Sequence, residues 1–513
     1  MKLFRIIIIL LFIIIEKNIA QTNDETNFET PSGIGFSNQT DYSFDIKDRS
    51  ETFESWTNLD YSKGIFSAGL RLEIFQPNDP DPSIHRGKLY YADVAFKYLS
   101  VDLSKLNYGL KLTVGNYYEL FGRGMVLKSY EDRNIRVDNN LIGLKLEAYY
   151  DDLFITALSG TAANSQNIRE DIIQAIDISY LGINFLRPGF SYAVNIPQDQ
   201  NLGKTSLTSF RLEPSIWNFD FYFEFGAKQN QKIKEQFLSK NEIIVGKGFY
   251  AGSSFYIGQL SISAEYKLYD NFSFTSSDQT ISYNTPPALR KEYTYLLLNR
   301  HPSPLNANNE KGFQVELNYS FDDQTNFQTT YGITNSLNKN SYYQRINRLN
   351  IPSQLQFKEF FLQANRIWDE GFNSTFAFGY SEELSSSTKN ITPIIENKFY
   401  FDDINTIKVV LEHQHTTNTL TNEKYFSNVL ALEYLRSPSF NVILLTEMQT
   451  KERDNGKLVR KFWSFIEFGY KIFSNTDLSL LIGSRQAGNI CIGGVCRFEP
   501  EFRGVELKIL TRI

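Results

Sequence analysis

Apolar and polar residues alternate along almost the whole of this 513-residue chain. Residues 66–74 show the pattern clearly, with Phe66, Ala68, Leu70, Leu72 and Ile74 at every second position. The same period recurs at 217–225, 260–268 and 313–321. Because successive side chains of a strand point to opposite faces, each segment predicts a β-strand with one apolar and one polar face. Strands of about nine to eleven residues are longer than ordinary globular strands and match tilted membrane-spanning strands.

The connections between these segments are of two kinds. Short turn clusters include Asp270-Asn271, Asp322-Asp323 and Ser474-Asn475. Longer polar connections occupy residues 77–86, 163–170, 276–290, 335–350 and 383–390. Counting segments gives about 24 strands, within a range of about 20 to 26. The sequence therefore predicts an all-β fold: a single large transmembrane antiparallel β-barrel with short periplasmic turns and longer extracellular loops.

Composition agrees with this prediction. The chain has 42 Phe and 30 Tyr, yet its mean hydropathy is −0.33. In a barrel, the aromatic and aliphatic half of each strand faces lipid while the polar half faces a wet lumen. The alternative is a secreted soluble β-protein, which would have shorter strands and central strands that are apolar on both faces.

The N-terminal 20 residues are typical of a signal peptide. Residues 1–5 include two basic side chains, residues 6–15 are uninterrupted apolar residues, and Ala20 is the small residue expected before the cleavage site. We expect cleavage after Ala20, a flexible segment at 21–32 and a barrel at 33–513. Export of this kind predicts the outer membrane of a Gram-negative cell, with its lipid and its assembly machinery as partners.

The last residues predict how the barrel closes. Val505, Leu507, Ile509, Thr511 and Ile513 share one face of a strand that runs to the end of the chain. A final strand of this kind can pair with the first, which leaves no unpaired edge in lipid. The ending is similar to that of proteins inserted by the outer-membrane assembly machinery, in which an aromatic last residue is commoner.

The two cysteines, Cys491 and Cys496, flank a Gly-Gly turn. Opposed positions across a hairpin suit a disulfide, and an exported protein meets oxidising conditions. A redox-active pair is the alternative, but it needs a neighbour that stabilises a thiolate, and Arg497 alone is weak support.

Residues 113–134, TVGNYYELFGRGMVLKSYEDRN, followed by DNNLIG at 138–143, form a distinctive motif. This motif resembles the signature of an uncharacterised family of exported Bacteroidota proteins, and CIGGVCR at 491–497 resembles that family's C-terminal hairpin. The resemblance implies an outer-membrane barrel and carries no known activity.

The same motif interrupts the alternation with two glycines, Gly122 and Gly124, around Arg123. Its candidate lumen or constriction residues are Glu119, Arg123, Lys128, Tyr130, Glu131, Arg133 and Asp138. Since irregular backbone is not tolerated in contact with lipid, the segment must lie in the lumen, in a loop or at the rim. It forms either a constriction whose charges set selectivity or a structural ion-pair network that braces the wall or plugs the lumen.

Evidence for an enzyme is weak. His413 and His415 lie two residues apart on a predicted strand, but on its apolar face near the end, which favours interfacial side chains over a metal site. We find no catalytic motif, and we expect neither cofactor nor metal. A net charge of −6 without a basic patch argues against nucleic-acid binding.

Three functional classes remain. The leading one is porin-like, passive or gated solute transport. The second is a non-transport barrel that serves as an assembly, export or surface-binding scaffold with protein partners, and the third is a barrel-embedded enzyme. Alternation begins by about residue 33, which leaves no room for the separate plug domain of an energised receptor.

Overall fold

The structure is a computed structural model that describes residues 33–76, 91–164, 168–300, 304–452, 458–492 and 495–513. The predicted signal peptide, the segment 21–32 and the predicted connection 77–86 lie outside the described residues.

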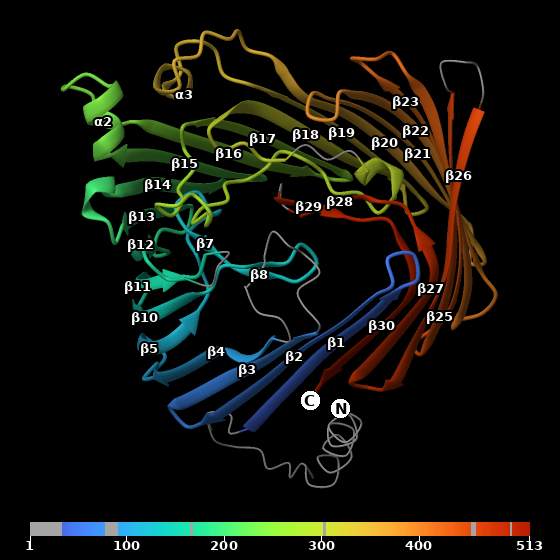
Figure 1. The fold of residues 1–513 in the computed structure, drawn as a ribbon, viewed down its shortest axis with the longest axis horizontal. Coiled ribbons are helices and arrows are strands. Elements are labelled where there is room, and N and C mark those ends of the chain that lie inside the picture. Colours follow the sequence, from blue (N-terminus) through green and yellow to red (C-terminus); the bar gives the residue numbers. More distant parts are fainter. Residues whose placement is uncertain (1–32, 77–90, 165–167, 301–303, 453–457, 493–494) are drawn as a thin grey trace.

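A single antiparallel sheet of 24 strands forms the wall of a barrel (Figure 1). Its strands are β1 (Gly33–Asp45), β2 (Ser50–Lys63), β3 (Phe66–Gln76), β4 (Tyr91–Asp102), β5 (Tyr108–Tyr117), β10 (Leu141–Tyr150), β11 (Leu153–Ala162), β12 (Ile172–Tyr180), β13 (Leu186–Ile196), β14 (Thr205–Ile216), β15 (Phe219–Asn230), β16 (Gly246–Ile257), β17 (Leu260–Asp270), β18 (Asn309–Asp322), β19 (Thr325–Asn335), β20 (Leu355–Asp369), β21 (Phe372–Glu383), β22 (Thr388–Tyr400), β23 (Asn405–Asn418), β24 (Lys424–Arg436), β25 (Phe440–Glu452), β26 (Leu458–Phe473), β27 (Thr476–Arg485) and β30 (Phe502–Arg512). Each strand pairs with its neighbours in chain order, which confirms the predicted all-β antiparallel barrel.

The barrel closes between its first and last strands. β30 pairs with β1 from Ser37↔Arg512 to Asp45↔Gly504, and with β27 on its other side. The predicted role of the C-terminal strand is therefore confirmed, and closure removes the edge that lipid could not satisfy.

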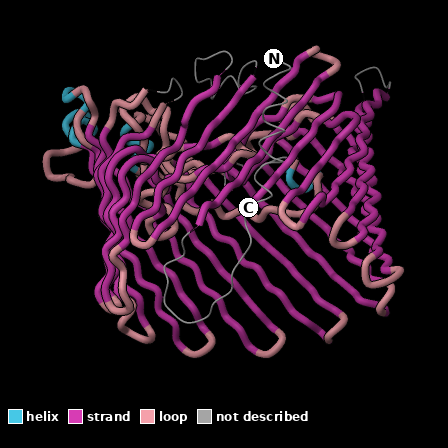
Figure 2. The backbone as a smooth tube through the Cα atoms, turned by 90° about the horizontal axis from the view of Figure 1, so that it is seen from below, coloured by secondary structure: helices cyan, strands magenta, loops and turns pink. Residues whose placement is uncertain are grey.

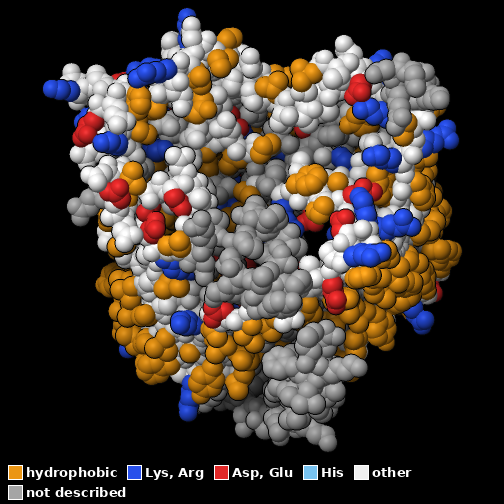
Figure 3. Space-filling model, viewed as in Figure 1, with side chains coloured by type: hydrophobic (Ala, Val, Ile, Leu, Met, Phe, Trp, Pro, Cys, Tyr) orange, Lys and Arg blue, Asp and Glu red, His pale blue; other side chains and the backbone are white. Residues whose placement is uncertain are grey.

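The alternating side chains divide between the two faces of the wall. In β15, Phe219, Phe223 and Phe225 are exposed on the outside, whereas Tyr222 and Glu224 are buried on the inside. Space-filling Figure 3 shows apolar side chains gathered over the outer surface of the barrel. An apolar outer surface of this kind suits contact with lipid.

The two ends of the barrel differ, as Figure 2 shows. At the end where β1 begins and β30 ends, the turns have two to five residues, as at 64–65 and 103–107. Long connections lie at the other end, including 118–140 and 271–308. That end also carries the helices α2 (Gln231–Phe237) and α3 (Tyr342–Ile346). No helix in the described ranges is long and apolar enough to cross a membrane.

Candidate functional site: the inner segments and the lumen passage

Three connections fold into the barrel. We call residues 118–140 inner segment A, residues 271–300 inner segment B and residues 486–492 with 495–501 the inner hairpin. Segment A contains the two-residue strands β6 (Glu119–Leu120), β7 (Lys128–Ser129), β8 (Glu131–Asp132) and β9 (Val137–Asp138). Segment B ends in the short helix η3 (Leu297–Asn299), and the hairpin is formed by β28 (Gly488–Ile492) and β29 (Val495–Glu499). Figure 1 shows β7, β8, β28 and β29 inside the ring of wall strands.

Glycines allow segment A to leave the wall and turn inward. Gly115, near the end of β5, has a φ of 109°, and a Cβ atom at this position would lie 2.3 Å from the backbone oxygen of Lys97. Gly122 and Gly124 have φ angles of 54° and 79°, a left-handed conformation that glycine adopts at little cost.

Segments A and B share a buried apolar core with the wall. The core includes Phe121, Met125, Val126 and Leu127 of segment A, Phe272, Phe274 and Leu289 of segment B, and Leu158, Ile173 and Leu207 of the wall. The expectation of a wet lumen is therefore wrong along this part of the wall, where inward-facing residues are apolar. Burying them against the two segments replaces contact with water by close packing.

Backbone hydrogen bonds join the two segments. The Lys128 N–H donates to the Tyr283 oxygen at 2.8 Å, and the Thr285 N–H donates to the Gly124 oxygen at 3.1 Å. The Asn284 side-chain amide donates to the Met125 oxygen at 2.9 Å. Segments A and B therefore form one packed body.

Wall carboxylates hold the later part of segment B. Glu412 of β23 accepts the N–H groups of Leu296 and Leu297 at 3.0 and 2.8 Å. Glu359 of β20 accepts the Tyr293 hydroxyl at 3.1 Å. Since buried polar groups that lose a hydrogen-bond partner are costly, these contacts fix the segment to the wall.

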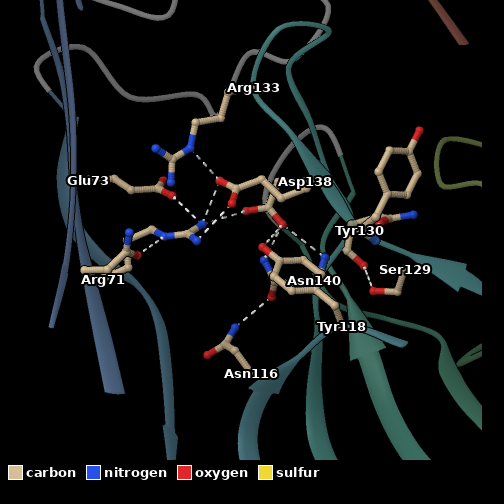
Figure 4. A network of polar contacts seen from close by, with 12 residues as sticks. Arg71, Glu73, Asn116, Tyr118, Ser129, Tyr130, Arg133, Asp138 and Asn140 are labelled. Carbon is tan, nitrogen blue, oxygen red and sulfur yellow. Dashed lines mark hydrogen bonds and ion pairs between the residues drawn. The ribbon is translucent and has the colours of Figure 1, made fainter. Parts of the chain in front are cut away.

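An ion-pair network joins segment A to β3 (Figure 4). The Arg71 guanidinium donates to both Glu131 carboxylate oxygens at 2.8 and 2.9 Å, and the Arg133 Nε donates to the same carboxylate at 3.0 Å. Asp138 accepts the Tyr118 hydroxyl at 3.0 Å and lies 4.0 Å from Arg71. Burial raises the pKa of Tyr118, and the nearby carboxylates raise it further. The hydroxyl therefore stays protonated and acts as a donor.

Carboxylate oxygens of Glu73, Glu131 and Asp138 lie within 4.8 Å of one another, a spacing compatible with a metal ion. Arg71 lies among them, 3.7 Å from Glu73 and 2.8 Å from Glu131. Its guanidinium supplies the positive charge that the cluster requires, so the geometry is that of an ion-pair network.

The other predicted residues of segment A are spread over its length. Glu119 pairs with Lys145 at 3.2 Å. Arg123 lies over the ring of Tyr222 at 4.7 Å from the centroid. These two contacts join segment A to the wall strands β10 and β15.

Lys128 and Tyr130 contact each other within the segment. The Lys128 ammonium lies 4.5 Å from the centroid of the Tyr130 ring. Burial lowers the pKa of Lys128. Burial also raises the pKa of Tyr130 to about 12, with a smaller contribution from the Asp132 charge. Our seven predicted residues thus form several contacts along the segment rather than one constriction ring, and their role in selectivity stays a prediction.

Sequence reasoning missed the wall partners of these segments. Arg71 and Glu412 occupy polar positions of predicted strands, so alternation placed them inside. Arg71 and Glu131 are 60 residues apart, and Leu297 and Glu412 are 115 apart. Alternation gives every polar position of a strand the same inward assignment, so the sequence held no local signal for which wall residue contacts which residue of the inner segments.

Cys491 and Cys496 are direct partners in the β28–β29 register. Their side chains lie outside the described residues, so the disulfide stays a prediction. His413 is exposed on the outer face of β23, and both His413 and His415 stack on Phe426. This placement agrees with interfacial side chains.

The lumen opposite the packed core is hollow. A main cavity of about 1720 Å³ lies between β1, β2, β25–β27 and β30 on one side and the three inner segments on the other. A turn-end cavity of about 550 Å³ adjoins the β24–β25 turn, residues 437–439. Both cavities are lined by Glu467, Ser479 and Lys508, so they adjoin at that level. The main cavity reaches residues 48–51 at the long-loop end, so the two together extend toward both ends of the barrel.

This architecture is that of an outer-membrane type β-barrel with a partly filled lumen. The chain belongs to a family of unknown function (DUF6029), whose model matches residues 1–513. No curated protein matches the chain at a significant level.

Among solved structures, the E. coli P pilus tip assembly intermediate PapC-PapD-PapK-PapG is similar in fold, with a TM-score of 0.52 and 9% identity. The match covers 96% of this chain and 63% of that chain. The copper transporter OprC has a TM-score of 0.46 at 8% identity, covering 96% of this chain and 82% of that one. OccD1 (OprD) has a TM-score of 0.39 at 12% identity, and the match covers 77% of this chain and 97% of that chain.

Proposed function

We propose that this protein is a channel in the outer membrane of a Gram-negative cell and that a small hydrophilic solute crosses through its two adjoining cavities. The observation that carries the proposal is the set of shared lining residues, Glu467, Ser479 and Lys508. They connect a cavity that reaches the long-loop end with one that reaches the short-turn end. The charged side chains that line the main cavity favour water and hydrophilic solutes over lipid. We also propose that the protein is exported by a cleaved signal peptide and that it has no catalytic activity.

The packed half of the lumen limits the size of the solute. Segments A and B are fixed by an apolar core, so they narrow the barrel permanently. The inner hairpin is held differently, through polar side chains. Glu501 pairs with Lys47 and accepts the Trp463 indole N–H at 2.9 Å, and Gln486 accepts from Arg300. Because such contacts exchange readily with water, the hairpin is the part that supports gated rather than constantly open passage.

Single-channel recording from the purified protein in planar bilayers tests this proposal. We expect discrete conductance steps that are small for a barrel of 24 strands, because the lumen is half filled. Glu501→Gln, which removes the ion pair between the hairpin and Lys47, should lengthen the open periods, whereas Glu242→Gln at the loop surface should not. A protein that is folded and inserted but never conducts would refute the proposal.

A scaffold that binds a protein partner is the second candidate. The long-loop end has exposed apolar side chains that include Phe237, Ile243, Leu349 and Ile351. Exposed apolar groups outside the membrane favour contact with another protein. Copurification from outer membranes distinguishes the two candidates: a stoichiometric partner without conductance would support the scaffold.

A further inference from the structure

Charged side chains of both signs line the main cavity. Eleven are carboxylates and seven are cations, which leaves an excess of four negative charges. Much of the lining is neutralised locally by ion pairs: Glu54–Arg136, Glu447–Arg300, Glu499–Arg497, Glu501–Lys47 and Glu506–Arg485. Paired charges contribute little field to a passing ion, so the remaining charges decide which ions enter.

The remaining charges are mostly negative. Lining carboxylates without an ion pair to any described residue include Asp41, Asp45, Asp48, Glu51 and Glu467. Among the described residues that line the cavity, the cations without an ion pair are Arg49 and Lys508. Asp48 and Glu51 lie at the long-loop end, where a solute would first meet the cavity.

Two of these carboxylates lie near the level at which the cavities adjoin. Lys508 is the register partner of Asp41 in β1 and of Ser479 in β27. Glu467 of β26 accepts the Ser479 hydroxyl at 2.7 Å. This level of the passage therefore carries two carboxylates against one ammonium group.

Asp41 supplies an independent observation. Its Oδ2 accepts the Gln39 side-chain amide at 2.9 Å, but its buried Oδ1 has no hydrogen-bond partner in the described structure. A buried carboxylate oxygen needs a partner, because leaving it desolvated and unpaired is costly. A hydrated cation or its water in the passage would supply one.

From these observations we infer that the passage selects cationic over anionic solutes, and that Asp41 and Glu467 are the residues that set this preference. The inference rests on the proposed transport function and specifies its substrate class. A low-dielectric wall strengthens the field of uncompensated lumen charges, so two carboxylates concentrate cations and exclude anions. Lys508 opposes them and keeps the selectivity moderate.

Reversal potentials across a bilayer with a KCl gradient test the inference on the full-length mature protein. We expect the wild type to be roughly threefold more permeable to K⁺ than to Cl⁻, because two uncompensated carboxylates are opposed by one ammonium group. The double variant Asp41→Asn, Glu467→Gln should bring the ratio to about 1 or below, and Lys508→Gln should raise it. Matched controls are Asp220→Asn and Glu213→Gln, which remove the same charges from residues that line neither cavity.

The outcomes separate the two proposals. Conductance that is anion-selective, or a K⁺ preference that survives the double variant, would overturn the cation inference while leaving a channel. Complete absence of conductance in folded protein would refute the channel itself, and the inference with it. Heat-dependent gel mobility of each variant verifies that the barrel has folded.

Discussion

Arg300 of inner segment B forms a two-point ion pair with Glu447 of β25 inside the barrel. Both terminal nitrogens of the guanidinium donate to the two carboxylate oxygens. The exposed fractions of the two side chains are only 11% and 3%. The pair attaches the end of segment B to the wall beside the main cavity, and it connects the packed half of the lumen to the hollow half.

Replacing Arg300 should therefore destabilise segment B. Arg300→Met leaves the Glu447 carboxylate buried without its partner, which costs about 3 kcal/mol. We expect faster cleavage of segment B in limited proteolysis and a lower urea midpoint in detergent. The control is Arg345→Met, which breaks the exposed pair with Glu242 and should cost less than about 1 kcal/mol. Equal effects of the two substitutions would contradict the assignment.

The shared core predicts a strong contrast between adjacent residues of segment A. Phe121 is 1% exposed, whereas Leu120 is 52% exposed. Phe121→Ala should lower the free energy of unfolding by about 3 kcal/mol, because it leaves a cavity in the core, while Leu120→Ala should change it by less than about 0.5 kcal/mol. Hydrogen exchange of segments A and B measures the difference. A Phe121→Ala protein with unchanged protection in both segments would show that they do not share a core.

Gly115 should not tolerate a side chain. Its φ of 109° is unfavourable for other residues, and a Cβ atom would clash with the Lys97 oxygen. We expect Gly115→Ala to cost at least about 2 kcal/mol and to reduce the yield of folded barrel. Gly488→Ala is the control, since a Cβ atom there meets no atom within 4 Å. Equal refolding yields for both variants would rule out this explanation of the inward turn.

The hairpin anchor should depend on pH. The Trp463 indole donates to Glu501 and, with a smaller contribution from Lys47, lowers the pKa of its carboxyl. A lowered pKa in the folded state stabilises the anchor above the carboxyl's ordinary pKa, and the stabilisation disappears as the pH falls through the lowered value. Anchoring should thus persist at neutral pH and weaken below about pH 4. Trp463→Phe should move that transition upward, as followed by the pH dependence of channel open time; an unchanged transition would exclude Glu501 as the responsible group.

The backbone register brings the two cysteines opposite each other, so we still expect a disulfide between Cys491 and Cys496. Mass spectrometry of unreduced protein should find no free thiol. Two alkylatable thiols in the native protein would disprove the bond.

Much of the architecture was predictable because it depends on local periodicity. Alternation at Val505, Leu507 and Ile509 identified a two-faced last strand, and counting the alternating segments gave about 24 strands. The packed half of the lumen was not predictable in the same way. Leu158 and Ile173 face inward, and strands that are apolar on both faces carry no signal for which face meets lipid. Likewise, the charges of segment A were found in the sequence, but Arg71 lies on a distant strand, so its pairing with Glu131 required the register of the whole wall.

The apolar inner wall makes this barrel a poor starting point for a wide pore. Leu158, Ile173 and Leu207 are buried only while the inner segments cover them. Excising both inner segments, residues 118–140 and 271–300, would leave these wall residues facing water on the inside as well as lipid on the outside. Such a barrel would collapse inward or aggregate, so engineering a larger opening has to start from the inner hairpin, whose described anchors are polar.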